Sequence, residues 1–112
     1  MDRKIIGESG ERQALEYLVK NNFKILAKNY RYGKAEIDII CTRDQTLVFV
    51  EVKKRKNSTY GYPETFVSSN QQKQIIRAAD HYIYATDWHD NIRYDVIAIT
   101  GDQLYHIEDA FY

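Results

Sequence analysis

The chain has 112 residues, the size of one domain, and such a domain can bury a core without disulfide bridges. Its single cysteine, Cys41, excludes a disulfide framework and a cysteine zinc cluster. The net charge is zero, yet residues 1–79 hold 15 Lys and Arg against 9 Asp and Glu, a net charge of +6. Residues 80–112 hold one basic and seven acidic residues. We expect one domain over residues 1–112, whose basic part is either a phosphate-binding face or ordinary solvated surface.

Neither a membrane segment nor a secretion signal is expected. The apolar stretches fall far below the ~18–20 residues that a membrane-spanning helix requires. The first residues, MDRKIIGESGE, lack the apolar core and the cleavage site of a signal peptide. One cysteine fits a reducing compartment, so the sequence predicts a cytoplasmic location.

The first half of the chain predicts one helix and three strands. The helix is expected over residues 8–21, because apolar residues there form a single stripe. Residues 23–32 alternate apolar and polar side chains, as a strand does. Residues 36–42 and 47–53 are two further strands rich in Ile and Val, and the second is apolar on both faces, as a covered central strand would be. The stripe of the helix consists of Ala14, Leu15, Leu18 and Val19.

The second half predicts one helix and two strands. Pro63 is placed to open or precede a helix, and apolar residues at helical spacing predict that helix over residues 72–85. After a loop at 87–91, strands are expected over 92–100 and 104–107. The element order α-β-β-β-α-β-β predicts an α/β fold, a single domain with a mixed central β-sheet flanked by helices.

The hairpin between the second and third strands carries the chemistry. A loop of two or four residues near Asp44 gives one register, in which Asp38 lies opposite Glu51 and Glu36 lies opposite Lys53. Opposed side chains on one face have Cβ atoms about 4.5–5.5 Å apart, so the two carboxylates would repel each other. They would also lie beside apolar neighbours, where unpaired charge is costly. A divalent cation between them, Mg²⁺ or Mn²⁺, would remove both penalties.

Two further residues extend this cluster. Lys53 follows Glu51 by two positions, so its ammonium lies on the same face and could neutralise charge at a phosphate or activate water. Glu11 lies on the apolar stripe of the first helix and would point at the sheet, although the helix dipole also favours a carboxylate near a helix start. The alternative for the strands is a set of ion pairs in which Lys53 satisfies Glu36 and Glu51 without a metal.

The arrangement of these residues resembles that of the PD-(D/E)XK nuclease superfamily. That pattern has an Asp on one strand, Glu-x-Lys on the next and a Glu on the preceding helix. More closely, the chain resembles the YraN-type family of small bacterial proteins, which are similar in fold to archaeal Holliday-junction resolvases. The matching segments follow the family's order along most of the chain. They are GERQALEYL at 10–18, NYR at 29–31, EIDII at 36–40, FVEVKKR at 49–55 and YDVIAI at 94–99.

The resemblance implies a restriction-endonuclease-like fold and a metal site. We expect a Mg²⁺-dependent endonuclease that hydrolyses DNA, with branched or damaged DNA as candidate substrates. By position, the family's active-site residues fall at Glu11, Asp38, Glu51 and Lys53. We expect Asp38 and Glu51 to bind Mg²⁺ or Mn²⁺ together with the backbone carbonyl of Val52. Resolvase-like folds often act as dimers, so a homodimer is left open.

Basic side chains near this cluster are expected to hold the DNA backbone, namely Arg31, Lys54, Arg55 and Lys73. The sequence departs from the family at two positions. Ala35 stands where the family usually has Gly, before its Glu-Ile-Asp. Gln71 stands where the family often has a Lys that opens the second helix, and Gln72 or Lys73 could serve in its place.

The remaining residues of interest have structural interpretations. His81, His89 and His106 lack metal-ligand spacing and are expected to be solvated or packed. Arg93 and Asp95 could brace the site from outside, but a structural ion pair is the expected arrangement. The tyrosines near the basic segments suit either stacking on unpaired bases or ordinary packing.

Two other functions fit the same residues. One is a nucleic-acid-binding module that keeps the fold without hydrolysis. The other is a protein-interaction subunit whose acidic C-terminal third recruits a partner.

Overall fold

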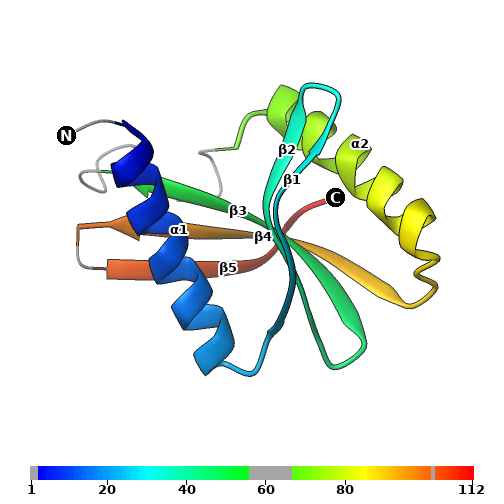
Figure 1. The fold of residues 1–112 in the computed structure, drawn as a ribbon, viewed down its shortest axis with the longest axis horizontal. Coiled ribbons are helices and arrows are strands. Elements are labelled where there is room, and N and C mark those ends of the chain that lie inside the picture. Colours follow the sequence, from blue (N-terminus) through cyan, green and yellow to red (C-terminus); the bar gives the residue numbers. More distant parts are fainter. Residues whose placement is uncertain (1–2, 56–66, 102) are drawn as a thin grey trace.

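A computed structural model describes residues 3–55, 67–101 and 103–112, with side chains except at 3–9 and 55. Two helices and five strands make up this part of the chain (Figure 1). The elements are α1 (Arg3–Lys20), β1 (Lys24–Tyr32), β2 (Ala35–Arg43), β3 (Thr46–Arg55), α2 (Ser69–Thr86), β4 (Asn91–Thr100) and β5 (Gln103–Phe111). The predicted order α-β-β-β-α-β-β and the predicted α/β class are confirmed.

The five strands form one mixed sheet in the order β1-β2-β3-β4-β5. Strands β3 and β4 pair in parallel, and the other neighbours pair antiparallel. The parallel pair requires a crossover connection, and α2 lies within it. Strand β3 is therefore paired on both sides, which agrees with its apolar sequence.

One helix lies on each side of the sheet (Figure 1). Helix α1 packs its buried residues Ala14 and Leu18 against one face, together with Ile39, Val50 and other residues of the central strands. Helix α2 covers the opposite face through Ile75, Ala78 and Ala79. Cys41 is fully buried in the core beneath α1, as expected for an inert thiol.

The boundaries of several elements differ from the predicted ones. Helix α1 begins at Arg3, five residues before the predicted start, and β5 continues to Phe111. Val19 is 60% exposed, so its assignment to the buried stripe was wrong. Pro63 lies outside the described residues. Neither helix in the described part of the chain is long and apolar enough to cross a membrane.

Helix α2 has well-defined caps at both ends. Ser68 is extended at the N-cap, and its hydroxyl accepts a hydrogen bond from the backbone N–H of Gln71. Asp87 ends the helix in the left-handed region, with φ of 56°, and the backbone N–H of Trp88 donates to the carbonyl of Ile83. The N-terminal cap places Gln71 in the first turn, where its side chain faces the sheet.

Candidate active site

The predicted register of the β2–β3 hairpin is confirmed as far as the pair Ile39–Val50. Beyond this pair the two strands are no longer matched, so neither of the expected pairs, Asp38 with Glu51 and Glu36 with Lys53, is part of the ladder. The carboxylate of Asp38 instead accepts a hydrogen bond of 2.8 Å from the backbone N–H of Val52. A side chain thus satisfies a donor that an undisturbed antiparallel ladder would satisfy with a carbonyl.

The alternation of side chains along β2 is also interrupted at this point. Ile37 is buried in the core beneath α2, whereas Ile39 is buried in the core beneath α1. In a regular strand, residues two apart share a face, so the change of face occurs at Asp38. Asp38 is therefore held between the two layers, at the place where β2 separates from β3.

Glu51, Lys53 and Gln71 form a connected group beside Asp38. Glu51 is buried, with 8% of its surface exposed. The Lys53 Nζ lies 3.3 Å from the Oε1 of Glu51. The Gln71 side chain links these two residues, because its amide nitrogen donates to Glu51 Oε1 at 3.1 Å and its amide oxygen accepts from Lys53 Nζ at 3.0 Å. Gln71 therefore orients both the carboxylate and the ammonium.

A second group surrounds Asn29, which falls opposite Asp38 between the pairs Lys28–Ile39 and Tyr30–Ile37. With its amide nitrogen turned to the acidic side chains, Asn29 donates to Glu11 Oε1 at 3.2 Å and to Glu36 Oε1 at 3.1 Å. Asn29 has a positive φ of 53°, a backbone conformation that Asn tolerates better than most residues. The Asn29 amide thus connects the carboxylate of Glu11 on α1 to that of Glu36 on β2.

The electrostatics of the two central carboxylates are unusual. Burial, followed by repulsion from Glu51, raises the pKa of Asp38 to about 8, and the negative charges of Glu11 and Glu36 contribute. Burial also raises the pKa of Glu51, although the nearby Lys53 ammonium opposes the change. Because two buried carboxylates that repel each other cannot both be charged without cost, the pair favours holding a proton. A cation could replace that proton.

The donor chemistry of this pair suits a hard divalent ion. Within the described residues, no group of three or more His, Cys, Asp or Glu side chains is arranged to hold a metal ion. Mg²⁺, however, is commonly bound by only one or two carboxylates, with water completing its octahedron. Asp38 and Glu51 also line an open cavity of about 370 Å³, which admits such waters. Two close carboxylates with raised pKa values and room for water therefore fit Mg²⁺ or Mn²⁺.

Comparisons with known proteins identify the family of this chain. Residues 10–99 match the model of uncharacterised protein family UPF0102. The chain belongs to this family. A UPF0102 protein of Cytophaga hutchinsonii is 43% identical over 105 residues, which cover 93% of each chain. One of Christiangramia forsetii is 41% identical over 111 residues, covering 96% of this chain and 93% of the relative. Another, of Thermodesulfovibrio yellowstonii, is 38% identical over the full length of both chains. The resemblance to the YraN-type family is thereby confirmed.

In this UPF0102 protein, the basic residues expected to hold DNA lie in different surroundings. Arg31 is exposed and forms an ion pair of 3.5 Å with Glu36, beside the carboxylates. Lys54 is exposed, and its aliphatic part lies against Gly10 of α1. Lys73 is exposed on α2. The side chain of Arg55 lies outside the described residues.

Gln71, which stands where the family often has a Lys, is part of the site. Gln71 itself reaches the site, so neither suggested substitute takes its place. Gln72 instead donates its amide to the carbonyl of Val67, and Lys73 does not line the cavity. The other departure, Ala35, is buried and lines the same cavity.

Sequence reasoning missed Asn29 and misjudged Gln71. Both carried a local signal. Asn29 begins the NYR segment, and Asn is one of the few residues that readily adopt the positive φ found here. Ser68-x-x-Gln71 has the pattern of a capping box, in which the Gln side chain normally returns to the N-cap. Here that side chain is used for Glu51 and Lys53 instead.

Proposed function

We propose that this protein is a divalent-metal-dependent nuclease that hydrolyses phosphodiester bonds in DNA. The observation that carries the proposal is the pair of largely buried carboxylates, Asp38 and Glu51, which line one cavity and have raised pKa values. Such an arrangement is costly for stability, and a site for a cation explains why it exists. The Lys53 ammonium beside it suits a reaction that builds negative charge on a phosphate.

Three groups of this chain would hold the metal. Asp38 and Glu51 would supply one carboxylate oxygen each, and the backbone carbonyl of Val52 would supply a third ligand. A divalent ion bound there would polarise the phosphodiester and lower the pKa of a coordinated water. On loss of the proton that the raised pKa of Asp38 favours, both carboxylates would become available as ligands.

The remaining residues of the site would act on the substrate or on the ligands. Lys53 would stabilise the charge that develops on the non-bridging oxygens, and Gln71 would hold the ammonium at its position. Asn29 would keep Glu11 near Asp38, so that the Glu11 carboxylate can orient a water. Gln71 and Asn29 are therefore positioning residues in this scheme.

A nucleic-acid-binding module without hydrolysis is the second candidate. The observation in its favour is Gln71, because an amide bridges Glu51 and Lys53 where a second ammonium would stabilise the transition state more strongly. This candidate gives salt-dependent DNA binding without any effect of Mg²⁺ on the DNA.

Calorimetric titration with Mg²⁺ and Mn²⁺ tests the first candidate. We expect one divalent site in the wild type and its loss in Asp38→Asn, with a parallel loss of cleavage of branched and linear DNA. Asp44→Asn is the matched control, because Asp44 lies in the exposed turn of the same hairpin. A folded wild-type protein that binds neither ion in the presence of DNA would overturn the proposal.

A further inference from the structure

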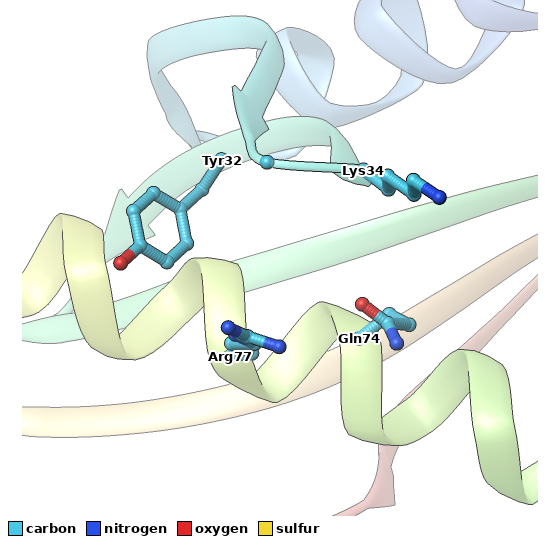
Figure 2. Close-up of a pocket in the computed structure, with 5 residues that line it drawn as sticks. Tyr32, Lys34, Gln74 and Arg77 are labelled. Carbon is cyan, nitrogen blue, oxygen red and sulfur yellow. The ribbon is translucent and has the colours of Figure 1, made fainter.

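A second cavity lies next to the carboxylate site, between the turn that joins β1 to β2 and the middle of α2. It has a volume of about 440 Å³. In Figure 2, the side chains of Gln74 and Arg77 rise from α2 towards this turn, which carries Tyr32 and Lys34. The lining residues are Tyr32, Gly33, Lys34, Gln74 and Arg77.

The charge of this cavity is positive. Lys34 and Arg77 are exposed, and neither forms an ion pair with a described residue. No Asp or Glu is among the lining residues. An Arg guanidinium binds a phosphate through two parallel hydrogen bonds, a Lys ammonium adds a point charge, and the amide of Gln74 can donate a further bond. These groups together suit one phosphate.

The wall of the cavity is held in place before any ligand binds. Tyr32 stacks on His81 with ring centroids 4.1 Å apart and ring planes 12° from parallel. The hydroxyl of Tyr30 is hydrogen-bonded to His81 Nδ1 at 2.5 Å, which fixes the imidazole. Gly33 has a φ of +62° in the tight turn, a conformation that glycine adopts without strain. The turn therefore presents Lys34 from a rigid hairpin.

Two residues connect this cavity to the carboxylate site. Lys34 and Gln74 line both it and the neighbouring cavity that contains Asp38 and Glu51. A nucleic-acid strand with one phosphate at the carboxylates would pass these two side chains on its way to Arg77. Adjacent phosphates of a strand repel each other, so a cationic pocket beside the acidic cluster would offset the charge there.

We propose that the cavity lined by Lys34, Gln74 and Arg77 is a subsite for the phosphate that flanks the scissile phosphodiester. This inference rests on the proposed nuclease function, and it adds the requirement that the substrate be a nucleic-acid strand that extends beyond the cleaved bond. Arg77 and Lys34 bind that phosphate, and the stack of Tyr32 on His81 keeps the pocket open.

The test measures binding of a fluorescein-labelled oligothymidylate by anisotropy, in EDTA and over a range of salt concentrations. The variants are Lys34→Gln and Arg77→Gln. Lys24→Gln is the matched control, because Lys24 is also exposed but begins β1, at the end of the strand far from the turn (Figure 1). All three variants remove one positive charge.

We expect Lys34→Gln and Arg77→Gln each to weaken binding about three- to tenfold, and to reduce the slope of log K against log salt by ~0.7, the value of one lost contact to single-stranded phosphate. Lys24→Gln should leave both quantities unchanged. The same loss should occur with an abasic strand, because phosphate and not base is bound. Equal effects of all three variants, or a loss confined to strands with bases, would overturn the assignment.

Cleavage of the same strand with Mg²⁺ separates this proposal from the nuclease function. If Asp38→Asn abolishes cleavage while Arg77→Gln behaves like Lys24→Gln, the subsite is wrong and the nuclease function stands. If neither the wild type nor any variant cleaves the strand but Arg77→Gln still reduces the salt slope, the nuclease function fails and the phosphate pocket remains. A wild-type protein that does not bind the strand refutes both.

Discussion

Asp38 on β2 and Asp95 on β4 occupy similar positions in the backbone and have opposite electrostatic properties. Each lies at an interruption of a strand ladder, and each accepts a hydrogen bond from a backbone N–H of the next strand, that of Val52 or Asp109. Asp95 is fully buried, yet its pKa is lowered. Asp38 keeps some solvent-accessible surface, and its pKa is raised to about 8.

The difference lies in the partners of each carboxylate. Although burial raises the pKa of Asp95, hydrogen bonds from His106 and Arg93 outweigh it. Arg93 binds both carboxylate oxygens at 2.8 Å, and His106 Nε2 lies 2.7 Å from one of them. Asp38 has acidic neighbours instead of cations. A buried carboxylate with a full set of donors stabilises the fold, whereas one without them is available for a ligand.

The largest expected effect is at Asp95. Asp95→Asn removes the charge opposite Arg93 and leaves buried donors poorly matched, so we expect the free energy of unfolding to fall by about 3 kcal/mol or more. Urea denaturation followed by circular dichroism measures this change. Stability that is unaffected by the substitution would show that the group formed by Asp95 with Arg93, His106 and Asp109, the Asp95 cluster, does not stabilise the fold.

The same substitution at Asp38 should have the opposite sign. Its folded pKa of about 8 lies above the ordinary value of 3.8, so the folded state holds a proton that the unfolded state releases. Without metal, wild-type stability should therefore fall as the pH rises from about 4 to about 8. Asp38→Asn should remove most of this slope and raise stability at pH 8 by about 1–3 kcal/mol. Urea unfolding in EDTA at pH 5 and pH 8 measures both effects, and a destabilised Asp38→Asn would contradict them.

Mg²⁺ should supply the charge that the Asp38 site lacks. At a concentration ten times its dissociation constant, a ligand that binds only the folded state adds about 1.4 kcal/mol. We expect this gain at pH 8 in the wild type, a smaller gain at pH 6, where Asp38 holds its proton, and none in Asp38→Asn. Thermal unfolding with and without Mg²⁺ detects it, and an equal gain in Asp38→Asn would place the ion elsewhere.

The smallest effect concerns the outer end of the Asp95 cluster. The hydroxyl of Tyr17 on α1 is hydrogen-bonded to His106 Nδ1 at 2.9 Å, which links the first helix to β5. Tyr17→Phe keeps the packing of the ring and removes this bond, so the free energy of unfolding should fall by about 0.5–1.5 kcal/mol. Tyr84→Phe is the control, because Tyr84 is 89% exposed. Equal changes in both variants would rule out a stabilising role for the bond.

Much of the Asp38 site could be predicted because it is local in sequence. The hairpin register follows from a short turn and from the two-residue period of strands. The sequence alone therefore predicted that Asp38, Glu51 and Lys53 lie close together. What could not be predicted was the separation of β2 from β3 beyond Ile39, since it depends on how a twisted sheet packs between two helices.

The Asp95 cluster was harder to predict than the site. The ion pair with Arg93 was expected from a spacing of two residues, and it is confirmed. The contact with His106 depends on the register shift between β4 and β5 that follows Tyr94, and a strict alternating pattern does not show such a shift. Tyr17 comes from the other end of the chain, so only the packed fold brings it to His106.

Cys41 provides a reporter for these comparisons. It lies on β2, three residues after Asp38, and burial raises the pKa of its thiol to about 12. Because thiolate is the reactive form and the native thiol is inaccessible, an alkylating reagent can modify Cys41 only in molecules whose sheet has opened. When the sheet recloses faster than the reagent reacts, the rate of labelling therefore reports the population of opened molecules, without denaturant. The single cysteine of the natural sequence thus serves as a labelling probe for opening of β2, the strand that carries Asp38.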